Sequence, residues 1–106
     1  MFNNDAVYDL IKASIKDEIE IEIQDKKQMH NDGIDVSSEY VADFITLRKI
    51  LYHNIDYYNK KKRLEVSHIR DLLNYIDDEI EKAISYVKFN IVLMDKSRIF
   101  KSKLEV

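Results

Sequence analysis

Glu65 and His68 have side-chain types and a spacing that could support metal chemistry. Carboxylate-bridged di-iron bundles use two Glu-x-x-His motifs together with inward-facing carboxylates from other helices. This chain has one such pair, at the start of an expected helix, and its other two histidines have no matching partner. The sequence therefore predicts no metal site.

Acidic side chains are concentrated in residues 17–22 and 77–81. Mg²⁺ sites need carboxylates that converge with the phosphates of a substrate. Most of these acids flank apolar stripes, which is where solvated charge is expected on a helix. We therefore predict no catalytic residues, no cofactor and no small-molecule substrate.

Arg63 and His68 have the spacing Arg-x4-His. This pair resembles the motif of the HEPN ribonucleases, helical domains of similar size that form a composite site in a dimer. The resemblance implies that His68 acts as general acid and base while Arg63 stabilises the charged phosphate. Leu64 follows the arginine, where that family commonly has a polar residue. The alternative interpretation is a basic loop followed by a solvated histidine in the first turn of a helix.

A basic patch lies next to these residues and suggests a third kind of function. Basic side chains neutralise phosphates, and the neighbouring Tyr57 and Tyr58 could stack on unpaired bases. The net charge of the chain is −3, which argues against avid binding to duplexes. An alternative function is therefore a small subunit that binds single-stranded nucleic acid. Its expected contact residues are Lys60, Lys61, Lys62, Arg63 and Arg70.

The elements that carry these residues are expected to be long helices. The chain has 106 residues, no proline and one glycine, and these two residue types are what interrupts helices and forms tight turns. Apolar residues at spacings of three and four predict helices over residues 5–30, 38–59 and 68–96. The short connections at 31–37 and 60–66 favour antiparallel neighbours. We predict an all-α, antiparallel three-helix bundle as one domain, 1–96, with a basic, partly mobile tail, 97–106.

Several local features support these helix boundaries. Gly33 fits a left-handed cap at the end of the first helix, and Ser37 and Ser67 are the expected N-caps of the other two. The alternation in residues 18–23 is a strand signal. We favour helix there because the isoleucine series at every fourth position continues through the segment.

Each expected helix has an apolar face that predicts the core. In the first helix this face is Val7, Tyr8, Ile11, Ile15, Ile19 and Ile23. In the second it is Tyr40, Val41, Phe44, Leu47, Leu51, Ile55 and Tyr58, a seam like that of a coiled coil. In the third it is Ile69, Leu72, Leu73, Ile76, Ile80, Ala83, Ile84, Val87, Ile91 and Met94. Arg48 lies inside the second face, where it either pairs with Glu18 or Glu22 or packs its stem at the bundle edge.

More apolar side chains are present than a three-helix core must bury. These residues lie off the main faces or in the segment 86–94, which is apolar on every side. Tyrosine is common in protein interfaces, and the chain has seven. We therefore predict a homodimer or another protein–protein contact. The expected interface residues are Leu10, Ile21, Ile50, Tyr57, Tyr86, Phe89, Val92 and Leu93.

These observations predict a small, non-enzymatic interaction protein that binds itself and a larger protein. It would act as an adaptor, an assembly subunit or a stoichiometric inhibitor of a larger machine. The wealth of Lys, Ile, Asn and Tyr suggests an AT-rich genome and is compatible with a phage or mobile element. The N-terminal residues lack the pattern of a signal peptide, and no apolar run approaches the roughly 20 residues of a membrane span. We therefore expect a cytoplasmic protein.

Overall fold

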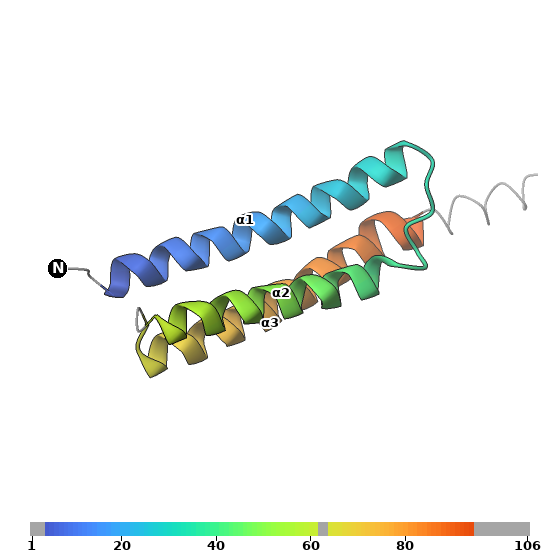
Figure 1. The fold of residues 1–106 in the computed structure, drawn as a ribbon. Helices are drawn as coiled ribbons and strands as arrows, with labels where there is room; N and C mark the ends of the chain where they lie inside the picture. The colour runs from blue at the N-terminus through green and yellow to red at the C-terminus, as the bar shows by residue number, and fades with distance from the viewer. Residues whose placement is uncertain (1–3, 62–63, 95–106) are drawn as a thin grey trace, which may run out of the picture.

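Three long helices account for most of the chain. The computed structural model describes residues 4–61 and 64–94. The helices are α1 (Asn4–Asn31), α2 (Tyr40–Lys60) and α3 (Val66–Val87), and α3 continues into one π-helical turn, η1 (Lys88–Val92). Successive helices run in opposite directions (Figure 1). This arrangement confirms the predicted all-α, antiparallel three-helix bundle.

Helix α1 is continuous through residues 18–23, so the strand signal there does not determine the local structure. The helix ends at Asn31, and Gly33 follows as the predicted left-handed cap with a φ of +79°. The N–H of Gly33 donates to the carbonyl of His30 at 3.0 Å, and the N–H of Ile34 donates to the carbonyl of Met29 at 2.9 Å. These two bonds form a Schellman motif and satisfy the last carbonyl groups of the helix.

The predicted serine caps of α2 and α3 are each wrong by two residues, because the N-caps are Glu39 and Glu65. The Asp35 carboxylate accepts a hydrogen bond from the N–H of Ser37, and α2 begins only at Tyr40. Helix α3 begins at Val66, one residue before Ser67, after Glu65 in an extended conformation. The side chain of Leu64 is buried just before it, which fixes the point where the chain turns into the helix.

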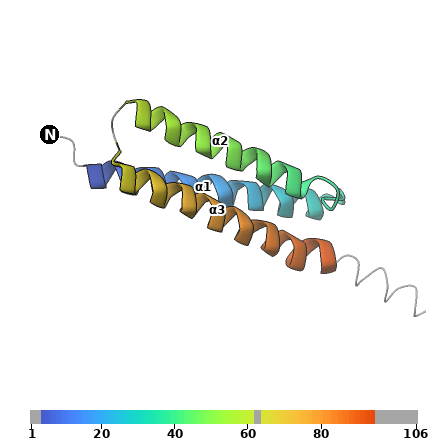
Figure 2. The same ribbon diagram turned by 90° about the horizontal axis from the view of Figure 1, so that it is seen from below.

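Helix α3 is the centre of the bundle and contacts both other helices more extensively than they contact each other. Figures 1 and 2 show α1 and α2 lying along different sides of α3. The predicted faces form the core, except that Val41 and Tyr58 of α2 and Met94 after η1 are exposed. No helix in the described segments combines the length and the apolar character needed to cross a membrane. The largest fully buried side chains among the described residues are Phe44, Ile55, Leu72, Ile76 and Val87.

The π-helical turn η1 corrects two predictions about the end of α3. The N–H of Leu93 bonds to the carbonyl of Lys88, five residues earlier. Such a turn contains one more residue than an α-helical turn, so all later side chains are rotated about the helix axis. Val92, predicted to contact a partner, is therefore turned into the core and is 7% exposed. Met94, predicted for the core, is turned outward and is 49% exposed.

Candidate functional site

A groove with an apolar floor runs between α1 and α2. Its volume is about 820 Å³. The floor is formed by core residues of both helices, Ile11, Ile15, Leu51 and Ile55, and its edges by Leu10, Tyr57 and Tyr58. The groove exists because α1 and α2 each pack mainly on α3, which leaves the side between them uncovered.

Four predicted interface residues belong to this side of the bundle. Leu10 and Tyr57 line the groove itself. Ile21 follows Leu10 by eleven residues, about three helical turns, and Ile50 precedes Tyr57 by seven, about two turns, so both continue the same two stripes. All four side chains are between 51% and 71% exposed. We call the surface made by Leu10, Ile21, Ile50 and Tyr57 together with the groove the α1–α2 face.

The other predicted interface residues lie near the end of α3. Tyr86 lines a smaller cleft between α1 and α3, and the ammonium of Lys27 lies 5.0 Å from the centre of its ring. Phe89 and Leu93 are exposed on and just after η1. These residues are separate from the α1–α2 face, so the predicted interface set falls into two groups.

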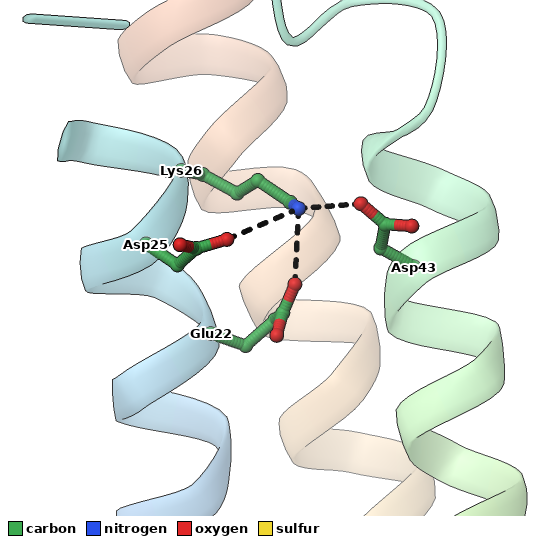
Figure 3. A network of polar contacts seen from close by, with 4 residues as sticks. All are labelled: Glu22, Asp25, Lys26 and Asp43. Carbon is green, nitrogen blue, oxygen red and sulfur yellow. Dashed lines mark hydrogen bonds and ion pairs between the residues drawn. The ribbon is translucent and has the colours of Figure 1, made fainter. Parts of the chain in front are cut away.

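A buried lysine links α1 to α2 beyond the far end of the groove. Lys26 is 3% exposed, and its Nζ lies 2.5 Å from Asp43 of α2 (Figure 3). The same ammonium lies 3.0 Å from Glu22 and 3.6 Å from Asp25, both on α1. Burial lowers the pKa of Lys26, but the hydrogen bonds to Asp43 and Glu22 more than offset this, so its pKa is raised above 10.5. The ammonium therefore stays charged in the core.

Sequence reasoning missed the burial of Lys26, although a signal was present. Lys26 follows Ile19 by seven residues, which returns it to the core side of α1. Glu22, four residues before it, is a suitable ion-pair partner. Glu22 was considered for Arg48 instead, but it pairs with Lys26. The Nε of Arg48 is buried and has no hydrogen-bond partner in the described part of the chain.

His68 is packed against α1 rather than solvated, which corrects one of the two interpretations of this residue. Its Nε2 lies 3.1 Å from the Asp5 carboxylate, and its ring stacks on that of Tyr8 with 4.9 Å between the centroids. The Tyr8 hydroxyl donates a hydrogen bond to Asp71 of α3. Arg63, the expected catalytic partner of His68, lies outside the described residues. The contacts of His68 therefore join α1 to α3, and the nuclease interpretation stays a prediction.

The predicted nucleic-acid patch is described only in part. Lys60 pairs with Asp56 at 3.2 Å, and the Lys61 ammonium lies 5.7 Å from the centre of the Tyr57 ring. Arg70 is exposed on α3, whereas Lys62 lies outside the described residues, as Arg63 does. Two of the five expected phosphate contacts thus already have an intramolecular partner, and binding to nucleic acid stays a prediction.

Neither metal-site geometry nor similarity to known proteins adds a further assignment. Among residues 4–61 and 64–94, no group of three or more His, Asp or Glu side chains is arranged to hold a metal ion. No family model, no curated protein and no solved structure matches this chain. The α1–α2 face is the candidate functional site because it combines an apolar groove with four exposed apolar side chains.

The titration of three core-edge groups predicts a loss of stability at alkaline pH. Burial and a hydrogen bond to Asp77 raise the pKa of Tyr52 above 10.0, and burial followed by the nearby Glu79 raises that of Tyr75. The pKa of Lys26 is raised as well. All three groups hold their protons more tightly in the folded state, so the unfolded chain releases protons first. Their stabilising contribution is complete below about pH 10 and is lost as the pH rises through the raised values.

Guanidinium unfolding at intervals between pH 8 and about pH 11 checks this expectation. The free energy of unfolding should be nearly constant up to about pH 9.5 and then fall. The variant Tyr52→Phe should show a shallower fall, because one of the three groups no longer titrates. Equal stability of the wild type at pH 9 and at about pH 11 would contradict the prediction.

Proposed function

We propose that this protein is a non-enzymatic interaction module of the cytoplasm that binds another protein chain through the α1–α2 face. In this role it serves as an adaptor, an assembly subunit or a stoichiometric inhibitor of a larger machine. The single observation that carries the proposal is an open apolar groove edged by the exposed Leu10 and Tyr57, whose stripes Ile21 and Ile50 continue beyond it.

The energetics of burial support this use of the face. Covering a Leu or Ile side chain stabilises a complex by roughly 1.5–3 kcal/mol relative to leaving it in water. Single exposed apolar residues are common, but contiguous apolar patches mark interaction sites. Here Leu10 and Tyr57 stand beside a floor that is itself apolar, so a partner that fills the groove gains contacts with both.

The shape of the groove favours a helix as the bound element. Its lining extends from Val7 to Ile15 on α1 and from Leu51 to Lys61 on α2, about 12–15 Å along the helix axes. That length accommodates two to three turns of an added helix. An amphipathic helix placed there would present its apolar residues to Ile11 and Ile55, as in other helix-in-groove complexes.

A paired set of variants tests the proposal. Leu10→Ser with Tyr57→Ser removes two apolar side chains from the face without touching the buried core, so folding should be preserved. Val66→Ser is the control, because Val66 is an exposed apolar residue on α3. In affinity capture from the cells that encode the protein, wild type and control should retain the same partner, and the double variant should lose it.

A photocrosslinking residue introduced into the protein in the same experiment locates the surface that contacts the partner. Placed at position 50 on the face it should crosslink to the captured partner, and placed at the exposed position 78 of α3 it should not. If the double variant retains every captured protein, or if only position 78 crosslinks, the α1–α2 face is not the binding site.

A further inference from the structure

The four exposed apolar side chains of the α1–α2 face form two pairs at similar distances from a common midpoint. Lys26 and Asp43 face each other in the antiparallel pair, so opposed positions on α1 and α2 have residue numbers that sum to about 69. On this count Tyr57 is level with residue 12, next to Leu10, and Ile50 is level with residue 19, next to Ile21. One apolar pair therefore stands at each end of the face. The polar groove residues Ser14 and Asn54 lie between the two pairs.

The two ends of the face carry opposite charge. Lys61 lines the groove at the end where α2 finishes. At the other end three carboxylates, Glu22, Asp25 and Asp43, surround the single ammonium of Lys26. Within the face, the first end therefore presents the ammonium of Lys61, and the second has an excess of negative charge.

We propose that the partner bound by this face is a second copy of the chain, related by a two-fold axis that crosses the helices at the midpoint of the face. This proposal rests on the proposed function, because it assigns the occupant of the same surface. The groove is then covered by the α1–α2 face of the partner rather than filled by a single helix. A two-fold interface must be complementary to itself. The crossing axis places Leu10 against the partner's Ile21 and Tyr57 against the partner's Ile50. It also brings the positive end of each copy to the negative end of the other.

The charge distribution selects this axis over the other two-fold arrangement. An axis parallel to the helices would place each end of the face against the same end of the partner. The two positive ends would then meet, the two acidic ends would meet as well, and both contacts would be repulsive. Only the crossing axis combines apolar contact at both ends with attraction between the charged ends.

The crossing axis fixes the register of the two copies. Opposed positions on α2 of the two copies then have residue numbers that sum to about 107, as 50 and 57 do. Asn54 lies next to the axis, close to the partner's Asn54. Lys61 faces the partner's Thr46. Thr46 is exposed and precedes Ile50 by four residues, so it lies on the same stripe of α2.

The size of the face predicts a reversible dimer. Two helices about 10 Å wide, over a length of about 30 Å, present an area at or below the low end of stable protein interfaces. Monomer and dimer should therefore exchange, with the dimer dominant only at high protein concentration. This equilibrium makes small changes in affinity measurable.

Substitutions of Thr46 test both the partner and the register. Thr46→Lys places a second cation opposite Lys61 at two symmetric positions, and it should raise the dissociation constant about tenfold. Thr46→Glu places an anion there and should lower the constant about fivefold. Thr46→Lys with Lys61→Glu restores an attractive pair and should return to within about threefold of wild type. Lys49→Gln, at an exposed position of α2 outside the groove, lowers the net charge by one, as Thr46→Glu does, and as the matched control it should change the dissociation constant little.

Sedimentation velocity over a concentration series, from low micromolar to submillimolar, measures these constants, and circular dichroism confirms folding of each variant. A wild type that stays monomeric throughout overturns the second-copy inference and leaves the proposed function to be decided by the Leu10 and Tyr57 variants. A dimer whose dissociation constant does not depend on the sign of the charge at position 46 also overturns the inference, because its interface then lies elsewhere. The inference is supported if the dissociation constant is lowest for Thr46→Glu, intermediate for wild type and highest for Thr46→Lys.

Discussion

Replacing Phe44 with alanine should lower the free energy of unfolding by about 3–5 kcal/mol, the largest loss expected from a single side chain in this protein. The Phe44 side chain is 0% exposed and belongs to the core that α2 and α3 share with α1. Its removal loses the transfer free energy of the ring and leaves a cavity that long, straight helices cannot easily close. Urea unfolding followed by circular dichroism measures the change.

Two companion variants make this prediction specific to packing. Phe44→Leu keeps most of the volume and should cost less than about 2 kcal/mol. Val41→Ala, one turn earlier on α2, removes a side chain that is exposed and should cost less than about 1 kcal/mol. A domain of this size has roughly 5–15 kcal/mol of stability in total, so Phe44→Leu remains measurable if Phe44→Ala does not fold. Similar losses for Val41→Ala and Phe44→Ala would show that the core is not where we place it.

Removing the counter-ions of Lys26 should cost about 3 kcal/mol, the second-largest effect expected. The double variant Glu22→Gln with Asp43→Asn keeps the shapes of the side chains but leaves the buried ammonium with only Asp25, at 3.6 Å. A buried charge without a partner is costly because it has lost its hydration. Asp25 and the partial exposure of Asp43 keep the loss at the low end of the usual range.

Lys26→Met is the informative comparison, because it removes the buried charge rather than its partners. Methionine fills a similar volume, and a hydrophobic replacement of a buried ion pair is often close to neutral. We expect a change within about 1 kcal/mol in urea unfolding. If Lys26→Met is as damaging as the double variant, then the ion pair itself stabilises the bundle. A larger loss for Lys26→Met than for the double variant would show that an unpaired buried ammonium is not the source of the instability.

The helix-forming pattern of the sequence was sufficient to predict much of the fold. The isoleucines of α1 recur every fourth residue, and this periodicity outweighs the alternation in residues 18–23 because a helix can continue through it without a turn residue. Gly33 ends α1 as expected because only glycine adopts a positive φ without steric cost. The helix starts were predicted less well. The N-caps are Glu39 and Glu65 rather than the serines. The connections before them contain the hydrogen bond from Ser37 to Asp35 and the buried Leu64, which a helical pattern does not predict.

The candidate site was predictable residue by residue but not as a surface. Leu10, Ile21, Ile50 and Tyr57 could be identified because they lie off the apolar stripes of their helices. Their membership in one face depends on which helix pairs pack closely, and a helical pattern does not contain that information. Val92 was assigned wrongly for a related reason. The π-helical turn that buries it rotates the end of α3, and no glycine or proline marks that turn in the sequence.

The sequence alone determined the all-α class, the number and lengths of the helices, and the identity of most core residues. These properties follow from local periodicity and from the scarcity of helix-breaking residues. Only the tertiary structure decided that α3 is central, that α1 and α2 leave a groove between them, and that Lys26 is buried at its far end. Those features arise from the relative placement of residues distant in sequence, which depends on how three apolar faces of unequal width pack around one another.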